Sequence, residues 1–278
     1  MTASSAPAPI SDRAIHEALA SSIRPPAPGP LSTSLAFGWR ALLKIKHIPD
    51  QLVDVTLFPV MFTLLFTFVF GGALSGSTAE YVQFLLPGMI VQAVLLITMY
   101  TGMTLRTDVE RGVFDRFRSL PVWRPSPIVG MLLGDAVRFA TAATTTGLLG
   151  LALGWRPAGG FAGVVLGVLL LLVFAFSLGW VWTFLGLVLR SSSAVMSASM
   201  MVMMPLTFGS NIYVDPVTMP TWLRAVVELN PVSPVVTSVR HLADGAAVGA
   251  EIGYTLIWAL LLVAVFGSLT MWRYRRTR

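Results

Sequence analysis

The sequence predicts an all-α integral membrane protein with six transmembrane helices. Hydrophobic residues make up 55% of the 278 residues, charged residues make up 12%, and the mean hydropathy is +0.76. Soluble globular domains are more polar than this. The apolar residues form long runs without charge, and the basic residues flank those runs. A run of about 20 apolar residues is long enough to cross a bilayer as a helix.

The chain divides into two predicted parts. Residues 1–33 are rich in Pro, Ala and Ser and contain no apolar core of signal-peptide length. We expect a flexible cytoplasmic N-terminal arm there, because such a composition favours an extended linker. Residues 34–278 contain every long apolar run and are predicted to form one membrane domain.

An amphipathic helix is predicted at the start of this domain, in SLAFGWRALLKIKHIP. Four residues with helical spacing form its apolar face, and three basic residues lie outside that face. The apolar residues are Leu35, Trp39, Leu42 and Leu43, and the basic ones are Arg40, Lys44 and Lys46. Such a helix lies in the plane of the cytoplasmic membrane surface. A plain cytosolic connection to the first span is the alternative.

Six spans are predicted from the apolar runs. A shorter run extends backward through Asp135 and Arg138, which are three residues apart on one helical face and can pair at the membrane edge. The charge-free runs are residues 55–79, 81–105, 157–189, 191–214 and 252–272, and the remaining span, third in chain order, is 139–155, extended back to Pro127.

The basic residues predict the orientation of the spans. With six spans both termini share a side, and of the 19 Lys and Arg residues only Arg156, Arg224 and Arg240 would lie on the other side. The positive-inside rule therefore places both termini of a multi-pass plasma-membrane protein in the cytoplasm. Five tryptophans fall near predicted interfaces, as in aromatic belts: Trp39, Trp123, Trp155, Trp222 and Trp272.

Two short outer-side helices are predicted between the fifth and sixth spans. The first covers residues 221–229, and the second begins with Ser233 as N-cap and Pro234 at its first position and ends before Gly245. Neither is long enough to cross a bilayer. They either rest on the outer surface or form a partly re-entrant pair.

Two apolar motifs inside the spans are weaker signals. Gly163 and Gly167 form a GxxxG spacing, which permits close approach of two helices. Methionines gather in MSASMMVMMP at residues 196–205. Methionine offers an adaptable surface for varied apolar ligands, although a methionine stripe also serves plain helix packing.

A charged segment, DVERGVFDRFRSLPVWRP at residues 108–125, interrupts the apolar runs. Thr107 and Glu110 have the spacing of a capping box, acidic residues precede basic ones, and Pro121 prevents continuation. These features predict a short amphipathic helix beginning at Thr107, in which Gly112 would allow close approach by another chain. We interpret it as a docking helix, because a loop that only fixes topology requires neither a cap nor an apolar stripe.

Three stretches resemble one transporter family. ERGVFDRFRSLPVWRPSPIVGMLLGDAVR is similar to the signature loop of type-2 ABC exporter permeases, in the branch of the daunorubicin and doxorubicin resistance exporter. FLLPGMIVQA and IYVDPVTMPTWLRAVVELNPVSPVVTSVRHLADG resemble the same family. The resemblance implies an ABC type-2 transmembrane permease domain over 34–278 and a cytoplasmic coupling helix that docks into a separate ATPase. It places there Glu110, Arg111, Gly112, Asp115, Arg116, Phe117 and Arg118.

The sequence carries no recognisable catalytic machinery. A nucleotide-binding P-loop requires a lysine after a glycine-rich turn, and the two lysines both lie in RALLKIKH. The chain is therefore predicted not to be an enzyme, with ATP and Mg bound by a partner ATPase in two copies. It has no cysteine and three scattered histidines, which disfavours a metal or cofactor site. Basic residues that flank spans also disfavour a nucleic-acid partner.

The predicted function is ATP-driven export. The permease would pair with a second copy or a homologue in the lipid bilayer and move hydrophobic or amphipathic small molecules, drug or polyketide-like, out of the cell. The alternatives are a lipid or lipid-linked glycan exporter, an ion-coupled secondary carrier, and an anchor that only recruits an ATPase. The scarcity of ionisable residues inside the spans disfavours the ion-coupled carrier.

Overall fold

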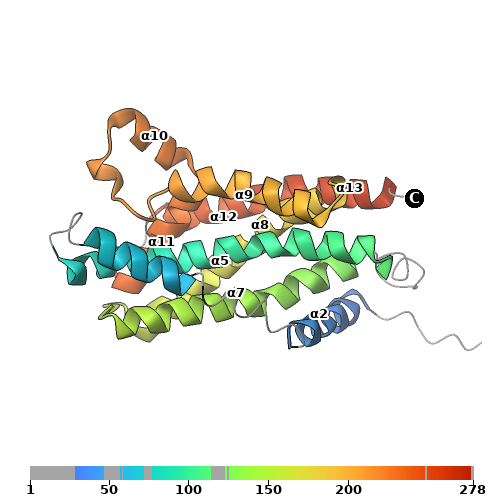
Figure 1. Ribbon diagram of the computed structural model, residues 1–278, viewed down its shortest axis with the longest axis horizontal. Coiled ribbons are helices and arrows are strands. Elements are labelled where there is room, and N and C mark those ends of the chain that lie inside the picture. Colours follow the sequence, from blue (N-terminus) through green and yellow to red (C-terminus); the bar gives the residue numbers. More distant parts are fainter. Residues whose placement is uncertain are drawn as a thin grey trace, which may run out of the picture.

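The protein is a bundle of long helices. The computed structural model describes residues 29–46, 57, 59–71, 77–113, 123, 125–247 and 249–276, and every regular element in this part of the chain is helical. In Figure 1 the long helices lie side by side along the longest axis, α10 projects near one end, and the C-terminus lies at the other. The predicted all-α class is confirmed.

The elements follow one another in this order: α2 (Pro30–Lys46), an apolar helix over Pro59–Val69 that runs into the π-helical turn η1 (Phe66–Phe70), α5 (Thr78–Glu110), α7 (Ser126–Ala152), α8 (Gly160–Val188), α9 (Ser192–Phe208), the 3-10 turn η2 (Pro216–Thr218), α10 (Thr221–Leu229), α11 (Val232–Asp244), α12 (Glu251–Leu262), the π-helical turn η3 (Val263–Gly267) and α13 (Ser268–Arg276). The last three form one continuous helical stretch. Since α2 begins at Pro30, its first turn lies within the predicted arm, and the rest of that arm lies outside the described residues.

Three of the described helices are long and apolar enough to cross a membrane: Thr78–Glu110, Gly160–Val188 and Glu251–Tyr274. They correspond to the second, fourth and sixth predicted spans. α7 has the length of a span and carries the buried pair Asp135 and Arg138. The structure therefore supports a membrane protein with at least three strongly apolar spans.

The predicted fifth span is longer than the helix found there. α9 ends at Phe208, and its 17 residues measure about 25 Å, a little less than the hydrocarbon thickness of a bilayer. The chain then turns at Gly209, and Ser210 and Asn211 are buried in a non-helical connection. Apolar composition alone did not reveal this end, because the residues after Phe208 are buried by neighbouring helices.

The helix α5 is the centre of the bundle. Most of its apolar residues are buried between α7, α8, α9 and α11. Two polar side chains inside the bundle are paired: the indole Nε1 of Trp182 donates to Thr98 Oγ1 at 2.7 Å, and that hydroxyl donates to the carbonyl of Leu95 at 2.6 Å. Such pairing is needed where no water is present.

The helix α2 turns its apolar face outward. Leu35 and Trp39 are 57% and 64% exposed, whereas Ser34 and Gly38 are buried against α7. A side chain at Gly130 of α7 would collide with the backbone of α2, so both helices meet through small residues. An outward apolar face and a small-residue inner face fit the predicted helix at the membrane surface.

The tryptophans are divided between surface and core. Trp39, Trp123, Trp222 and Trp272 are exposed, as interface residues are, but Trp155 is only 2% exposed. The prediction that Trp155 belongs to an aromatic belt is therefore wrong. Its position directly after α7 suggested an interface, yet the turn folds back and packs the indole into the main hydrophobic core.

The helix α11 lies inside the bundle, and α10 lies on its surface. Gly163 of α8 makes this packing possible: an added Cβ there would overlap the carbonyl oxygen of Leu242 in α11. The close approach predicted from the GxxxG spacing is thus confirmed. Val235 and Val236 are fully buried, whereas Trp222 of α10 is 71% exposed. α11 is therefore packed among the long helices, whereas α10 is exposed.

The start of α11 differs from the prediction. The helix begins at Val232, so Ser233 is not its N-cap. Asn230 supplies the capping contact instead, because its Oδ1 accepts from the amide of Val232 at 2.9 Å. Its Nδ2 also donates to the carbonyls of Leu206 and Gly209, which ties α11 to the end of α9.

Candidate functional site

The first three predicted coupling residues lie at the end of α5. Glu110 is the last residue of this helix, and Arg111 caps it through hydrogen bonds from its amide to the carbonyls of Thr107 and Val109. The predicted capping box at Thr107 is therefore wrong, since no helix begins there. No proline or glycine interrupts residues 103–110, so the helix of the second span continues through the expected boundary.

Gly112 lies in the turn that ends α5. Its φ angle is +65°, in the left-handed region that glycine adopts at no steric cost. No described atom lies within 4 Å of the position that its Cβ would take. The turn itself gives a conformational reason for this glycine, and the expected close approach by another chain stays a prediction.

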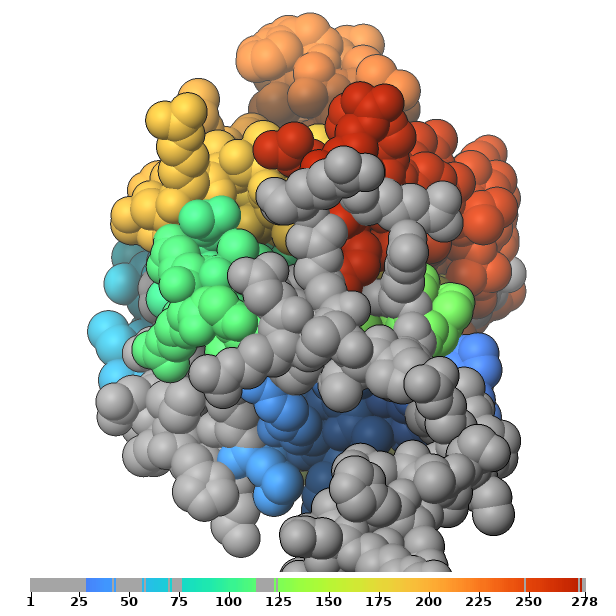
Figure 2. Space-filling model, turned by 90° about the vertical axis from the view of Figure 1, so that its right-hand side faces the viewer, coloured from blue at the N-terminus to red at the C-terminus, as the bar shows by residue number. Residues whose placement is uncertain are grey.

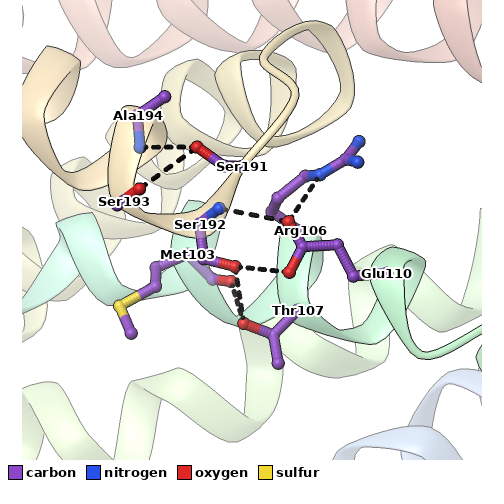
Figure 3. A network of polar contacts seen from close by, with 8 residues as sticks. All are labelled: Met103, Arg106, Thr107, Glu110, Ser191, Ser192, Ser193 and Ala194. Carbon is purple, nitrogen blue, oxygen red and sulfur yellow. Dashed lines mark hydrogen bonds and ion pairs between the residues drawn. The ribbon is translucent and has the colours of Figure 1, made fainter.

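Glu110 links the end of α5 to the start of α9. Its Oε1 accepts from the amide of Ser192 at 3.2 Å, and its Oε2 accepts from the Ser192 hydroxyl at 3.0 Å. Figure 3 shows both contacts together with the ion pair from Arg106 Nε to Glu110 Oε1 at 3.2 Å. Because a helix N-terminus attracts anions, the carboxylate also stabilises the first turn of α9.

Thr107 and Ser191 complete this network. Thr107 Oγ1 donates to the carbonyl of Met103 at 3.0 Å and lies 3.0 Å from Ser192 Oγ. Ser191 is the N-cap of α9, and its hydroxyl accepts from the amide of Ala194. Two consecutive serines thus hold the α9 terminus, one through its own helix and the other through α5 (Figure 3).

The carboxylate of Glu110 stays ionised in this setting. Glu110 lies beyond the uncharged stretch 81–105, and α5 measures about 50 Å, which exceeds the hydrocarbon thickness. Hydrogen bonds from Ser192, and then from Arg106, lower the pKa of Glu110 below its ordinary value. The link between α5 and α9 is consequently intact at neutral pH.

Charged residues gather at this end of the bundle. Figure 2 views the end directly and shows α2, the end of α5, the turn between α8 and α9 and the C-terminal helix around it. The charged residues of these ends include Arg106, Asp108, Glu110, Arg111, Arg190, Arg273 and Arg276. The other predicted coupling residues, Asp115, Arg116, Phe117 and Arg118, lie outside the described residues, so their predicted helix stays a prediction.

A second ionic group lies deeper in the bundle. Asp135 and Arg138 are 4% and 5% exposed, and Arg138 Nη1 donates to Asp135 Oδ1 at 2.9 Å. The predicted pairing is confirmed. Thr101 of α5 donates to Asp135 Oδ2 at 2.6 Å, so this ion pair also joins α7 to α5.

Sequence reasoning missed Ser192, Thr107 and Thr101 as partners. The available signal was the run of serines after Arg190, which is typical of an N-cap between two apolar helices. That pattern locates the start of α9. It contains no information that Glu110, 82 residues earlier, is the partner.

The sequence is similar to those of known transporter subunits. The family model "ABC-2 type transporter" matches residues 34–243. The chain is 47% identical over 267 residues to the daunorubicin resistance ABC transporter permease protein DrrB1 of Streptomyces coeruleorubidus, covering 96% of this chain and 94% of that protein. It is 26% identical over 201 residues to the doxorubicin resistance ABC transporter permease protein DrrB of Mycobacterium tuberculosis, covering 70% of each chain.

These matches identify the kind of subunit. An ABC-2 permease is the membrane component of a transporter, and the family implies association with an ABC ATPase. The apolar helices accordingly place the protein in a membrane. The chain belongs to the ABC-2 type transporter family, as a permease.

Proposed function

We propose that this permease exports hydrophobic or amphipathic drug-like molecules, driven by ATP hydrolysis in a separate ATPase. The main support is the 47% identity to a daunorubicin resistance permease, which extends over 96% of the chain. ATP and Mg would be bound by the partner, and two ATPase copies would act on a pair of permeases. Six spans with both termini in the cytoplasm agree with the distribution of basic residues.

The charged segment 108–125 would receive the force from the ATPase. Its first residues continue directly from α5, and Glu110 binds Ser192 at the start of α9. Movement of the segment would therefore reach two helices at once. The pair of Asp135 and Thr101 would carry the same movement to α7, because it joins α7 to α5. The segment would transmit movement from the ATPase to the helices and would take no part in a chemical reaction.

An apolar cavity offers space for part of the cargo. It measures about 190 Å³ and lies between α5, α9 and the helix that begins near Pro59. Met196 and Met200 contribute to its wall, together with Leu96 and Tyr100. Flexible thioethers adapt to ligands of different shape, which suits a transporter of varied apolar molecules.

Transport by reconstituted vesicles tests this proposal. The permease and its co-purified ATPase would be placed in vesicles loaded with an apolar fluorescent drug. We expect efflux that requires ATP and the ATPase and persists without an ion gradient. Efflux that continues without ATP but stops when the ion gradient is dissipated would favour the secondary carrier. ATP hydrolysis without any translocated drug would favour the anchor or another cargo, such as a lipid.

A further inference from the structure

A cavity lined by both apolar and charged residues lies at the end of the bundle that carries α10. It measures about 710 Å³, within the range of about 300–1,000 Å³ that is typical of small-molecule sites. Residues of α10, α11 and the first turns of α12 form its wall. In Figure 1 this region is at the end opposite the C-terminus, where α10 projects from the bundle. It is therefore separate from the charged end and from the methionine-lined cavity.

Five charged side chains line this cavity, and three of them already have a role in the fold. Arg224 Nε pairs with Glu228 Oε1 at 2.8 Å on the surface of α10. Asp215 caps the turn η2, where its Oδ1 accepts from the amide of Val217 at 2.9 Å. The remaining two are Arg240 and Glu251.

Arg240 is a half-buried cation whose hydrogen bonds go to neutral groups. Its Nε donates to the carbonyl of Phe84 and its Nη2 to the carbonyl of Asn211, both at 3.2 Å. The guanidinium also lies 3.9 Å from the centre of the Phe84 ring. No carboxylate of the described residues forms an ion pair with it. A guanidinium has five N–H donors, so further donors remain for an acceptor in the cavity.

Glu251 is the opposite charge on the wall of the same cavity. It is the first residue of α12 and is half-buried, and its Oε2 is a buried atom without a hydrogen-bond partner among the described residues, so a ligand would reach it only after a change of side-chain rotamer. The N-terminus of α12 stabilises the carboxylate, but it does not supply the missing donor. Glu251 and Arg240 do not pair with each other. Arg240 and Glu251 are thus the two charged side chains of this wall without a described ion pair or cap, although Asp215 and Asp244 act electrostatically on Arg240 from beyond ion-pair distance.

We propose that this cavity binds the headgroup of a zwitterionic phospholipid with a primary amine. The phosphate would bind Arg240, since guanidinium groups match phosphate oxygens with paired donors. The ammonium would bind Glu251, which lacks a donor. A ligand with only one sign of charge would leave one of these two groups unpaired, at the cost of its desolvation.

The surroundings favour a membrane lipid over a soluble molecule with the same headgroup. Trp222, Val226 and Leu229 of α10 are 71%, 52% and 76% exposed beside the cavity. Acyl chains of a bound lipid would cover such side chains, and an exposed tryptophan is typical of the membrane interface. The site is independent of the exported cargo.

Lipid retention measured by native mass spectrometry tests the proposal. The full-length protein would be released from nanodiscs that contain equal amounts of phosphatidylethanolamine, phosphatidylglycerol and phosphatidylcholine. We expect the wild type to retain phosphatidylethanolamine preferentially. Glu251→Gln should lower the ratio of phosphatidylethanolamine to phosphatidylglycerol about tenfold, which corresponds to the loss of one charge-assisted hydrogen bond. Arg240→Gln should reduce retention of both phospholipids.

The controls separate binding from folding. Arg156→Gln removes a cation from the same end of the bundle but outside the cavity, and it should leave retention unchanged. The lipid ratio in Glu251→Gln is measured within one sample, so it does not depend on the yield of folded protein. An unchanged ratio in that variant, or equal retention of all three lipids by the wild type, would overturn the proposal.

A soluble headgroup distinguishes the source of the ligand. Glycerophosphoethanolamine at the same concentration as the lipid should not displace it, because it lacks the acyl chains. Displacement at equal concentration would refute a membrane lipid as the occupant. None of these measurements involves ATP or drug, so their failure leaves the proposed export function untouched.

Discussion

Glu110 binds Ser192 through both of its carboxylate oxygens, across 82 positions of sequence. One oxygen accepts from the backbone amide and the other from the hydroxyl, so this single side chain fixes the end of α5 against the start of α9. Glu110 is also one of the first residues of the charged segment 108–125, which would dock into the ATPase. The contact therefore links that segment directly to a second long helix.

The first prediction concerns this contact. Glu110→Ala should reduce ATP-dependent efflux, because α9 would no longer follow α5. Ser192→Ala should reduce it less, since its amide still binds Glu110 Oε1. The double variant should be no worse than Glu110→Ala alone, because both changes remove the same link. Efflux rates in vesicles would measure this, and strictly additive losses would contradict a shared role.

The second prediction concerns the charged segment. Reversing the charge of Arg116 and Arg118 to Glu should abolish coupled efflux while membrane insertion remains normal, because like charges would then oppose docking of the ATPase. The control reverses Arg13 and Arg24 in the N-terminal arm, which changes the net charge equally. Efflux and membrane content would be measured together. Normal efflux by the Arg116 and Arg118 variant would contradict the proposed docking role of the segment.

The third prediction concerns the buried ion pair. Asp135→Ala should lower the free energy of unfolding by about 3–5 kcal/mol, because it leaves the Arg138 guanidinium buried without its carboxylate. Replacing both residues by Asp135→Leu and Arg138→Met should cost much less. Denaturant unfolding in detergent would compare them. If the double variant is as unstable as Asp135→Ala, the cost does not come from the stranded charge.

The fourth prediction concerns the contact between α8 and α11. Gly163→Ala should destabilise the protein by about 1–3 kcal/mol, because the added methyl group overlaps the backbone of Leu242. Gly253→Ala provides a matched control in a helix, since no described atom lies within 4 Å of its Cβ position. The control should be neutral or more stable by up to about 1 kcal/mol, through helix propensity. Thermal unfolding would measure the stability of both variants, and equal stability of the two would contradict the predicted overlap at Gly163.

The fifth prediction concerns orientation. The chain has no cysteine, so single cysteines report their own accessibility. Arg111→Cys and Ala247→Cys place a thiol on exposed residues at the two ends of the bundle. In intact cells a membrane-impermeant maleimide should label Ala247→Cys alone, and Arg111→Cys only after lysis. The reverse pattern would place the charged segment outside the cell.

Local sequence patterns predicted a helix correctly where its length and its ends are determined by nearby residues. The apolar run after Thr78 and the proline before Thr221 located α5 and α10, because helix length and termination are encoded nearby in sequence. The capping box at Thr107 failed for the opposite reason. Its spacing was correct, but the preceding helix had no signal to stop until Gly112.

The candidate site was predicted only in part. Charge density marked Glu110 and Arg111 as the start of a functional segment, yet the partner of Glu110 lies at the start of another helix. Similarly, the spacing of Asp135 and Arg138 predicted their pairing but not Thr101 on α5. Contacts between distant helices depend on the packing of the whole bundle, and no local pattern contains them.

The position of α2 has a consequence for biosynthesis. This helix packs on α7, yet 79 residues separate Lys46 from Ser126 in the chain. At about 5–20 residues per second, a ribosome needs on the order of 4–16 seconds to make that connection. During this interval α2 has no docking surface for Ser34 and Gly38. Its outward leucines and Trp39 can hold it on the lipid until α7 is inserted. The helix would then already lie at the membrane surface, where it packs on α7.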